Sequence, residues 1–286
     1  MERSEERIKE QVRQRYTSAV TKSESCCGTK STCCGAEVQL PEGRVVTSAG
    51  YTPDQLLSLP ADAITNSFGC GNPVAFAGVK SGETVVDIGS GAGIDCLLAG
   101  QIVGNEGKVI GIDMTPVMIE KARANAQKAG LSHVEFRLGD AENMPVESGA
   151  ADWIVSNCVI NLSPNKPRVY QEAFRVLKPG GKVSISDIVV EHIPWPLSWS
   201  SALRCACVAG AISESKYLNA MRQAGFSDAK VTERIYYDRD ELLHLIEESK
   251  LFAHSVLKGF YRFLVDRYIA GKIWSARIIA TKGTTL

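Results

Sequence analysis

Three features are missing from this sequence, and each absence narrows its possible functions. No segment approaches the roughly 18 to 20 consecutive apolar residues of a membrane span, and residues 1–7 lack the apolar core of a secretory signal. Net charge is missing too, because 32 basic residues balance 32 acidic ones. We therefore expect a cytoplasmic protein with no membrane or nucleic-acid partner and a small neutral or uncharged substrate.

Histidine is scarce, whereas cysteine is plentiful. The four histidines share no spacing that would suggest a catalytic or metal-binding group, so we interpret them as surface or packing residues: His133, His192, His244 and His254. Nine cysteines are hard to reconcile with a structural disulfide framework in the cytoplasm, where the thiol pool keeps most cysteines reduced. Their number instead favours thiol or metal chemistry.

The stretch that organises the chain is residues 84–93, TVVDIGSGAG. Apolar and β-branched residues followed by Gly89, Gly91 and Gly93 predict a buried parallel strand, a tight turn and a helix over 94–102. The glycines would let the backbone approach a ligand closely, with amide groups facing it. Their spacing departs from the dinucleotide pattern GxGxxG, and the run beginning at Asp87 resembles motif I of class I S-adenosylmethionine methyltransferases.

The next strands supply polar groups at their carboxyl ends. Asp113 ends a strand over 108–112 and lies 20 residues after Gly93, where a carboxylate can accept hydrogen bonds from both ribose hydroxyls. Asp140 follows a strand over 133–138 and can meet an adenine amino group, although a surface turn is an alternative interpretation. Cys158 follows a strand over 151–155 and is expected to face the substrate.

The order of elements is typical of an α/β fold. Further helices are expected over 5–20, 115–130, 168–177 and 239–268, and further strands over 182–188, 228–236 and 273–281. We predict a Rossmann-like, doubly wound, mostly parallel sheet over 49–189. An N-terminal helix and cysteine-bearing arm occupy 1–48, and a substrate cover with the last strands occupies 190–286.

Most of the cysteines lie outside the predicted sheet. Two CCG units place four of them in a Gly/Ser/Thr-rich arm: Cys26, Cys27, Cys33 and Cys34. A zinc site is the second interpretation of this arm, because adjacent cysteines do not match the usual spacing of zinc ligands. Cys70 lies in a glycine-bracketed loop near the predicted cofactor site, and Cys205 and Cys207 lie in the predicted cover.

Six motifs together resemble the arsenite S-adenosylmethionine methyltransferases over about residues 45–230: GCGNP (69–73), DIGSGAGIDC (87–96), GIDMTPVMI (111–119), SNCVINLSP (156–164), FRVLKPGG (174–181) and CVAGA (207–211). The resemblance implies that S-adenosylmethionine binds at Asp87, Gly89, Gly91, Gly93, Asp113, Met114, Asp140, Ala141 and Asn157. It implies arsenic(III) bound by Cys70, Cys158 and Cys207, with one arm cysteine as a fourth functional thiol. We take Cys34 as the candidate, because Cys33 and Cys34 are nearest in sequence to the core. The chain stops soon after its last strand, so a further C-terminal domain of longer relatives is not expected.

The implied chemistry accounts for the thiols. Trivalent arsenic is soft and thiophilic, so three thiolates can hold it with its lone pair exposed as the nucleophile, and no catalytic base is required. Methylation makes arsenic pentavalent, and a dithiol closing to a disulfide can return two electrons. We expect Cys70 and an arm cysteine to form that disulfide, and glutathione or a thioredoxin to reopen it.

Two other functions remain open at this stage. The chain could be a methyltransferase for another small molecule whose cysteines pack or bind zinc, or a non-catalytic thiol protein that sequesters metalloids. A monomer is expected. The sequence does not identify the fourth thiol among the arm cysteines, the role of Cys205, the final number of methyl groups or the physiological reductant.

Overall fold

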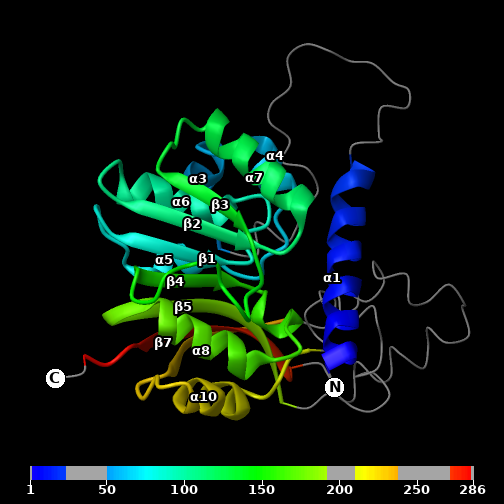
Figure 1. Ribbon diagram of the computed structural model, residues 1–286, viewed down its shortest axis with the longest axis vertical. Coiled ribbons are helices and arrows are strands. Elements are labelled where there is room, and N and C mark those ends of the chain that lie inside the picture. The colour runs from blue at the N-terminus through cyan, green and yellow to red at the C-terminus, as the bar shows by residue number, and fades with distance from the viewer. Residues whose placement is uncertain (1, 24–49, 192–209, 238–270, 285–286) are drawn as a thin grey trace, which may run out of the picture.

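The computed structural model describes residues 2–23, 50–191, 210–237 and 271–284. Seven strands form one sheet in the order β3-β2-β1-β4-β5-β7-β6 (Figure 1). The strands are β1 (Thr84–Ile88), β2 (Lys108–Asp113), β3 (Val134–Leu138), β4 (Ala151–Asn157), β5 (Leu177–Val190), β6 (Lys230–Tyr236) and β7 (Ile273–Thr281). The first five are mutually parallel, and β7 runs antiparallel to both β5 and β6. The predicted mostly parallel sheet is therefore confirmed.

The central strands are buried on both faces, which explains their nearly continuous apolar sequences. Alternate residues of β1 enter two different cores: Val85 packs with α6 (Ile94–Val103) and α7 (Pro116–Lys128). Val86 packs with α8 (Lys166–Val176) and α10 (Glu214–Gln223). This period of two places helices on both faces of the sheet. The strand directions then bring the carboxyl ends of β1, β2 and β4 to one side.

Three short helices and one long helix complete the described chain. The short helices precede β1 and are α3 (Pro53–Leu57), α4 (Ala61–Thr65) and α5 (Pro73–Ala77). A 3-10 turn, η1 (Ile160–Leu162), follows β4. The long helix α1 (Glu2–Ser23) stands across the side of the sheet to which the parallel strands point (Figure 1). Its buried residues include Val12 and Val20, which lie eight residues apart and so share one face of the helix.

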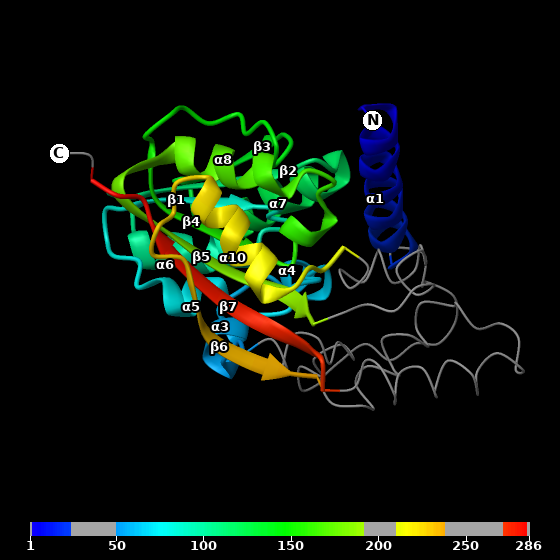
Figure 2. The same ribbon diagram turned by 90° about the horizontal axis from the view of Figure 1, so that it is seen from below.

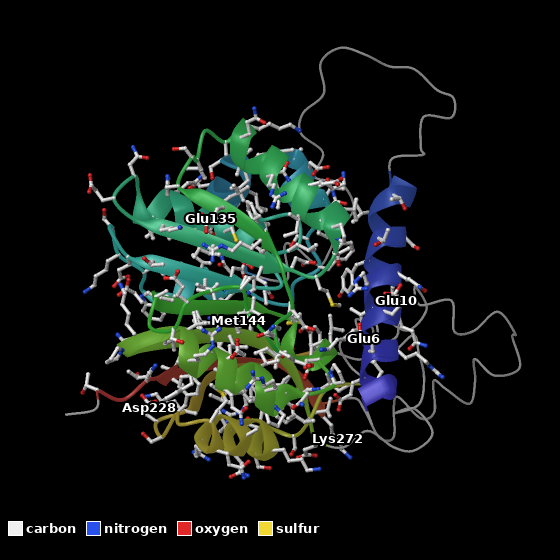
Figure 3. All side chains as sticks on the ribbon, viewed as in Figure 1. Glu6, Glu10, Glu135, Met144, Asp228 and Lys272 are labelled. Carbon is white, nitrogen blue, oxygen red and sulfur yellow. A yellow bond between two sulfur atoms is a disulfide. The ribbon has the colours of Figure 1, made fainter. Side chains whose placement is uncertain are left out.

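The antiparallel pair β6 and β7 forms one edge of the sheet (Figure 2). Asp228 and Lys272 precede the two strands and lie at opposite ends of this edge, as Figure 3 shows. Both late strands were expected, whereas α10 was not, because only Tyr217 and Met221 of this helix are buried and the apolar signal is short. The helix expected over 239–268 lies outside the described residues.

Within the described residues, no helix combines the length and the apolar character needed to cross a membrane.

Candidate functional site

The loop after β1 is open on the side that faces the pocket. Gly89, Gly91 and Gly93 all have positive φ angles, which non-glycine residues rarely adopt. A Cβ on Gly89 would lie 2.2 Å from Val159 Cγ2, whereas a Cβ on Gly91 would meet no atom within 4 Å. The hydroxyl of buried Ser90 finds no hydrogen-bond partner among the described residues. The loop thus offers close backbone approach and an unused polar atom to a ligand.

Asp113 joins this loop to the end of β2. Its carboxylate accepts hydrogen bonds from the N–H of Gly91 at 3.0 Å and of Thr115 at 2.8 Å. Burial raises the pKa of Asp113, and these two hydrogen bonds oppose that rise. A carboxylate held in this position can accept hydrogen bonds from hydroxyl groups of a ligand that lies against the loop.

The loop and Asp113 line a pocket that contains about 970 Å³ of empty space, including the part open to solvent. Seven of the nine residues predicted to bind the cofactor line it: Gly89, Gly91, Asp113, Met114, Asp140, Ala141 and Asn157. Gly93 and Asp87 lie behind the loop. A Cβ on Gly93 would lie 2.9 Å from the Phe136 ring, and Asp87 is 2% exposed and accepts a hydrogen bond from the Cys96 thiol. These two residues support the loop from the protein side.

Helix α1 forms a wall of the pocket that the sequence did not reveal. Lys9, Val12 and Tyr16 line the cavity. The Lys9 ammonium donates hydrogen bonds to Asp140 at 2.7 Å and to Glu142 at 2.6 Å. Burial lowers the pKa of Lys9, but the two carboxylates outweigh it, so the net pKa is raised. This ion pair fastens α1 over the pocket and occupies the carboxylate that the sequence assigned to adenine.

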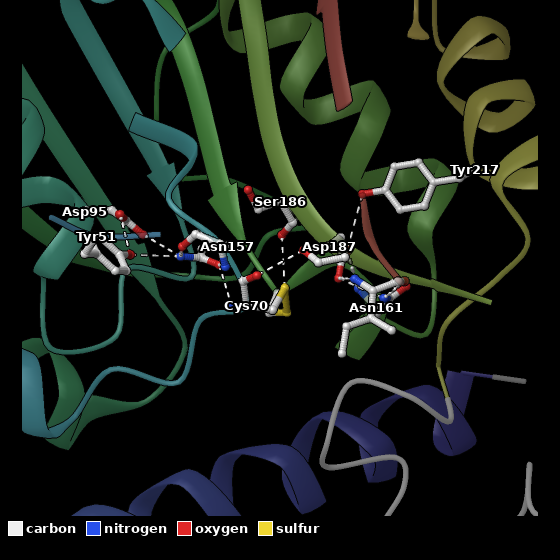
Figure 4. The surroundings of a disulfide bond; sticks show 12 residues. Tyr51, Cys70, Asp95, Asn157, Asn161, Ser186, Asp187 and Tyr217 are labelled. Carbon is white, nitrogen blue, oxygen red and sulfur yellow. Dashed lines mark hydrogen bonds between the residues drawn. A yellow bond between two sulfur atoms is a disulfide. The ribbon is translucent and has the colours of Figure 1, made fainter. Parts of the chain in front are cut away.

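The structure brings two of the predicted thiols together. Cys70 and Cys158, 88 residues apart in sequence, form a disulfide with a Cα–Cα distance of 5.7 Å (Figure 4). Cys158 lines the pocket and is 4% exposed. Its φ of 58° is the one positive φ of a non-glycine residue in the described chain, which marks local backbone strain of the kind that clusters at functional sites.

The partner of Cys70 in the structure is thus Cys158, whereas the sequence led us to expect an arm cysteine, and the arm lies outside the described residues. The sequence could not identify the partner, since the contact depends on how the loop at 69–71 packs against the end of β4. The remaining predicted thiols, Cys34 and Cys207, lie outside the described residues together with Cys26, Cys27, Cys33 and Cys205. No group of three metal-binding side chains occurs in the described ranges.

Asn157 lies between the glycine loop and the disulfide. Its side-chain oxygen accepts hydrogen bonds from the N–H of Cys70 at 2.8 Å and of Gly71 at 3.1 Å. Its amide nitrogen donates to the Gly71 carbonyl at 2.6 Å and lies 3.0 Å from Asp95. Burial raises the pKa of Asp95 to about 6, while hydrogen bonds from Asn157 and Tyr51 oppose the rise.

Another buried carboxylate, Asp187, lies on β5 beside these residues (Figure 4). It accepts hydrogen bonds from the backbone and side-chain N–H groups of Asn161 at 3.2 and 2.8 Å, from the N–H of Ile188 at 3.0 Å and from the Tyr217 hydroxyl at 3.3 Å. Burial raises the pKa of Asp187 to about 7, although the charge of Lys166 and these hydrogen bonds oppose the rise.

Asp187 should make stability depend on pH. Between its ordinary pKa of 3.8 and its folded pKa of about 7, the folded chain holds a proton that the unfolded chain has lost. The contribution of Asp187 to the free energy of unfolding should therefore fall as pH rises through this window, by on the order of 4 kcal/mol in total. We expect Asp187→Asn to become more stable relative to the wild type between pH 4 and 7, as measured by urea unfolding. Asn105→Ala, which changes an exposed residue without a titratable group, should show a constant difference, and so should Asp187→Asn if the assignment is wrong.

The sheet order, the glycine loop after β1 and the carboxylate at the end of β2 together define a class I methyltransferase fold. Residues 79–225, just over half of the chain, match the family model described as "Methyltransferase domain". The chain is 42% identical over 80% of its length to an arsenite methyltransferase of Halobacterium salinarum and 37% identical over 50% of its length to that of Homo sapiens. The crystal structure of an arsenic (III) S-adenosylmethionine methyltransferase from Chlamydomonas reinhardtii matches with a TM-score of 0.62 and 30% identity, covering 84% of this chain and 73% of that one.

The chain belongs to the arsenite S-adenosylmethionine methyltransferase family, as the six sequence motifs predicted. It spans 60% of the Halobacterium salinarum relative and 40% of the human one.

Proposed function

We propose that this protein methylates trivalent arsenic with S-adenosylmethionine as the methyl donor, which would detoxify arsenite. The observation that carries the proposal is the meeting of Cys70 and Cys158 at the edge of the pocket that the glycine loop lines. A methyltransferase for a substrate without affinity for sulfur has no need of two adjacent thiols there. A protein that only sequesters metalloids has no need of the loop and Asp113.

The residues of the pocket fit S-adenosylmethionine. The open face of Gly91 and the Ser90 hydroxyl, which has no partner among the described residues, can accommodate polar parts of the cofactor. Asp113 can accept hydrogen bonds from ribose hydroxyls. Asp140 and Ala141 line the part of the pocket under α1, where adenine would lie. When bound, the cofactor supplies an electrophilic methyl group on a sulfonium centre.

Arsenite would be bound by cysteine thiolates once the disulfide is reduced. Cys158 faces the pocket, Cys70 stands beside it, and Cys207 is the third ligand in this proposal. Soft thiolates match soft arsenic, and three of them leave its lone pair free. Since no proton has to leave arsenic, the site needs no general base, and the protein's task is to hold the substrate at about 3 to 3.5 Å from the reacting group.

The oxidised pair in the structure fits the reducing step of the same proposal. Transfer of a methyl cation to the lone pair makes arsenic pentavalent, and two electrons must return it to the trivalent state. Two thiols that close to a disulfide release two electrons and two protons. We propose that Cys70 supplies one of these thiols, that Cys34 takes part in the relay, and that glutathione or a thioredoxin-type protein reopens the disulfide.

Several further features belong to this proposal. We propose that the protein acts as a cytoplasmic monomer, without nucleic-acid or membrane partners, since its charges balance and its thiols need a reducing compartment. Residues 1–48 would form the thiol-bearing arm, 49–189 the cofactor domain and 190–286 the substrate cover.

The proposal can be tested by incubating the purified protein with arsenite, glutathione and methyl-labelled S-adenosylmethionine. Label should pass to methylated arsenicals, which liquid chromatography separates from the cofactor. Parallel reactions without glutathione should stop after the thiols are used once. Binding of arsenite without any label transfer would instead support a sequestering protein, and label transfer only to other small molecules would support a different methyltransferase.

Asp113→Ala should weaken S-adenosylmethionine binding. The substitution removes a charged acceptor for ribose hydroxyls and the hydrogen bond that holds Gly91, worth about 1.5 to 3 kcal/mol together. Calorimetry should show an increase in Kd of roughly 10- to 150-fold. Glu106→Ala, which removes an exposed carboxylate from the loop before β2, should bind the cofactor as the wild type does. An unchanged Kd for Asp113→Ala would place the cofactor elsewhere.

A further inference from the structure

The loop that carries Cys70 is held by atoms other than sulfur. Asn157 accepts the N–H groups of both Cys70 and Gly71, and the Cys70 carbonyl accepts a hydrogen bond from the Ser275 hydroxyl at 3.0 Å. Asn157 ends β4, and Ser275 lies on β7. Two strands of the sheet, β4 and β7, therefore hold the backbone of Cys70, and Figure 4 shows the contact with Asn157.

The loop at 69–71 also packs so closely against the sheet that it could not shift without losing these contacts. A Cβ on Gly69 would lie 2.3 Å from the Asn157 amide nitrogen, and a Cβ on Gly71 would lie 2.5 Å from Ser186 Cβ. These two glycines, which bracket Cys70, thus let the backbone lie directly against Asn157 and β5. The GCGNP motif places glycine where the loop meets the sheet.

Asn157 is in turn fixed by buried partners. Its amide nitrogen lies 3.1 Å from the Tyr51 hydroxyl and 3.0 Å from an Asp95 oxygen, and Tyr51 donates a hydrogen bond to the other Asp95 oxygen at 2.8 Å. Tyr51 and Asp95 are 6% and 3% exposed. The Asn157 side chain therefore has a defined orientation, and its polar atoms already have protein partners.

Cys158, which carries the second thiol, directly follows Asn157 in the sequence. The Cys158 N–H donates a hydrogen bond to the Ser186 carbonyl at 2.8 Å. The backbones of both cysteines are thus held by contacts that do not involve sulfur.

We propose that Asn157, oriented by Tyr51 and Asp95, is a positioning residue that holds Cys70 beside Cys158 in the reduced protein and keeps the two thiols as a preformed chelate. This inference rests on the proposed function, because the chelate would bind trivalent arsenic through two sulfurs. Preorganisation raises the effective concentration of one thiol toward the other, which favours both chelation and disulfide closure. The sequence had assigned Asn157 to the cofactor.

The experiment measures that effective concentration without any arsenical. The full chain is equilibrated in glutathione buffers, where oxidation of the dithiol by glutathione disulfide yields the protein disulfide and two molecules of glutathione. Differential alkylation and mass spectrometry of the two cysteine peptides give the oxidised fraction of this pair. Asn157→Ala should lower the effective concentration at least tenfold, and Tyr51→Phe, which keeps the ring, should lower it about threefold.

The controls separate positioning from general damage. Asn105→Ala, at an exposed asparagine, should leave the equilibrium unchanged. Thermal unfolding identifies variants that do not fold, and Tyr51→Phe provides the test if Asn157→Ala is one of them. A folded Asn157→Ala with the wild-type thiol equilibrium would overturn the proposal, and so would a loss confined to cofactor binding.

A second probe keeps this proposal separable from the proposed function. Phenylarsine oxide, which binds two thiols, should bind Asn157→Ala at least tenfold more weakly than the wild type. A wild-type protein that failed to methylate arsenite would refute the proposed function without altering either the thiol equilibrium or this binding. Equal binding of the probe by both proteins would refute the positioning role.

Discussion

Cys158→Ser is expected to abolish methylation of arsenite and of methylarsenite, while the Kd for S-adenosylmethionine stays within about twofold of the wild type. Cys158 is the described thiol that lines the pocket, and it is almost completely buried there. A serine hydroxyl is a hard, weakly acidic ligand and cannot replace thiolate toward trivalent arsenic. The backbone contact of residue 158 with Ser186 does not involve the side chain and should persist.

Turnover with labelled cofactor and calorimetry of cofactor binding measure the two halves of this prediction. Cys96→Ser is the matched control, because Cys96 is also buried but donates its hydrogen bond to Asp87 behind the glycine loop, where a hydroxyl can serve equally. It should retain turnover. Cys207→Ser should behave like Cys158→Ser if Cys207 is the third ligand. Retained turnover in Cys158→Ser would show that arsenic binds elsewhere.

The sheet could be predicted from the sequence because its signals are local. The apolar strand before Gly89, the carboxylate after the second strand and the late antiparallel strands each occupy a few consecutive residues. The expected strand positions agree with the structure to within a few residues, apart from β5, which begins at Leu177 rather than at 182. Helix α10 was missed because its packing against α8 depends on a pair of buried residues rather than on a long periodic face.

The site was less predictable because its decisive contacts join distant segments. Lys9 forms an ion pair with Asp140, which is 131 residues away in the sequence. Nothing in the sequence distinguishes this lysine from the other charged residues of the helix. The family resemblance indicated Asn157 as a cofactor-binding residue, but its partner Cys70 lies 87 residues away in the sequence. The motifs thus indicated which residues matter, whereas their roles depend on the packing of the loop, α1 and the sheet.

Cys70→Ser is expected to separate two substrates, losing arsenite methylation but keeping a first turnover on methylarsenite. Arsenite has three exchangeable positions and needs a third sulfur, which Cys70 supplies beside Cys158 and Cys207 in the proposed site. Methylarsenite has only two such positions. The substitution also removes the partner that closes a disulfide with Cys158, so turnover beyond the first should fail on either substrate.

Single-turnover assays with each arsenical, using reduced protein and one equivalent of labelled cofactor, measure this separation. The arm thiols could be removed by deleting residues 1–40, but this deletion would also remove the α1 wall of the pocket. The arm thiols are therefore better tested by Cys33→Ser and Cys34→Ser in the full chain. If Cys34 serves only in the relay, Cys34→Ser should keep the first turnover on both substrates and lose later ones. Equal loss of both first turnovers in Cys70→Ser would make Cys70 a structural residue, and equal retention would make it dispensable as an arsenic ligand.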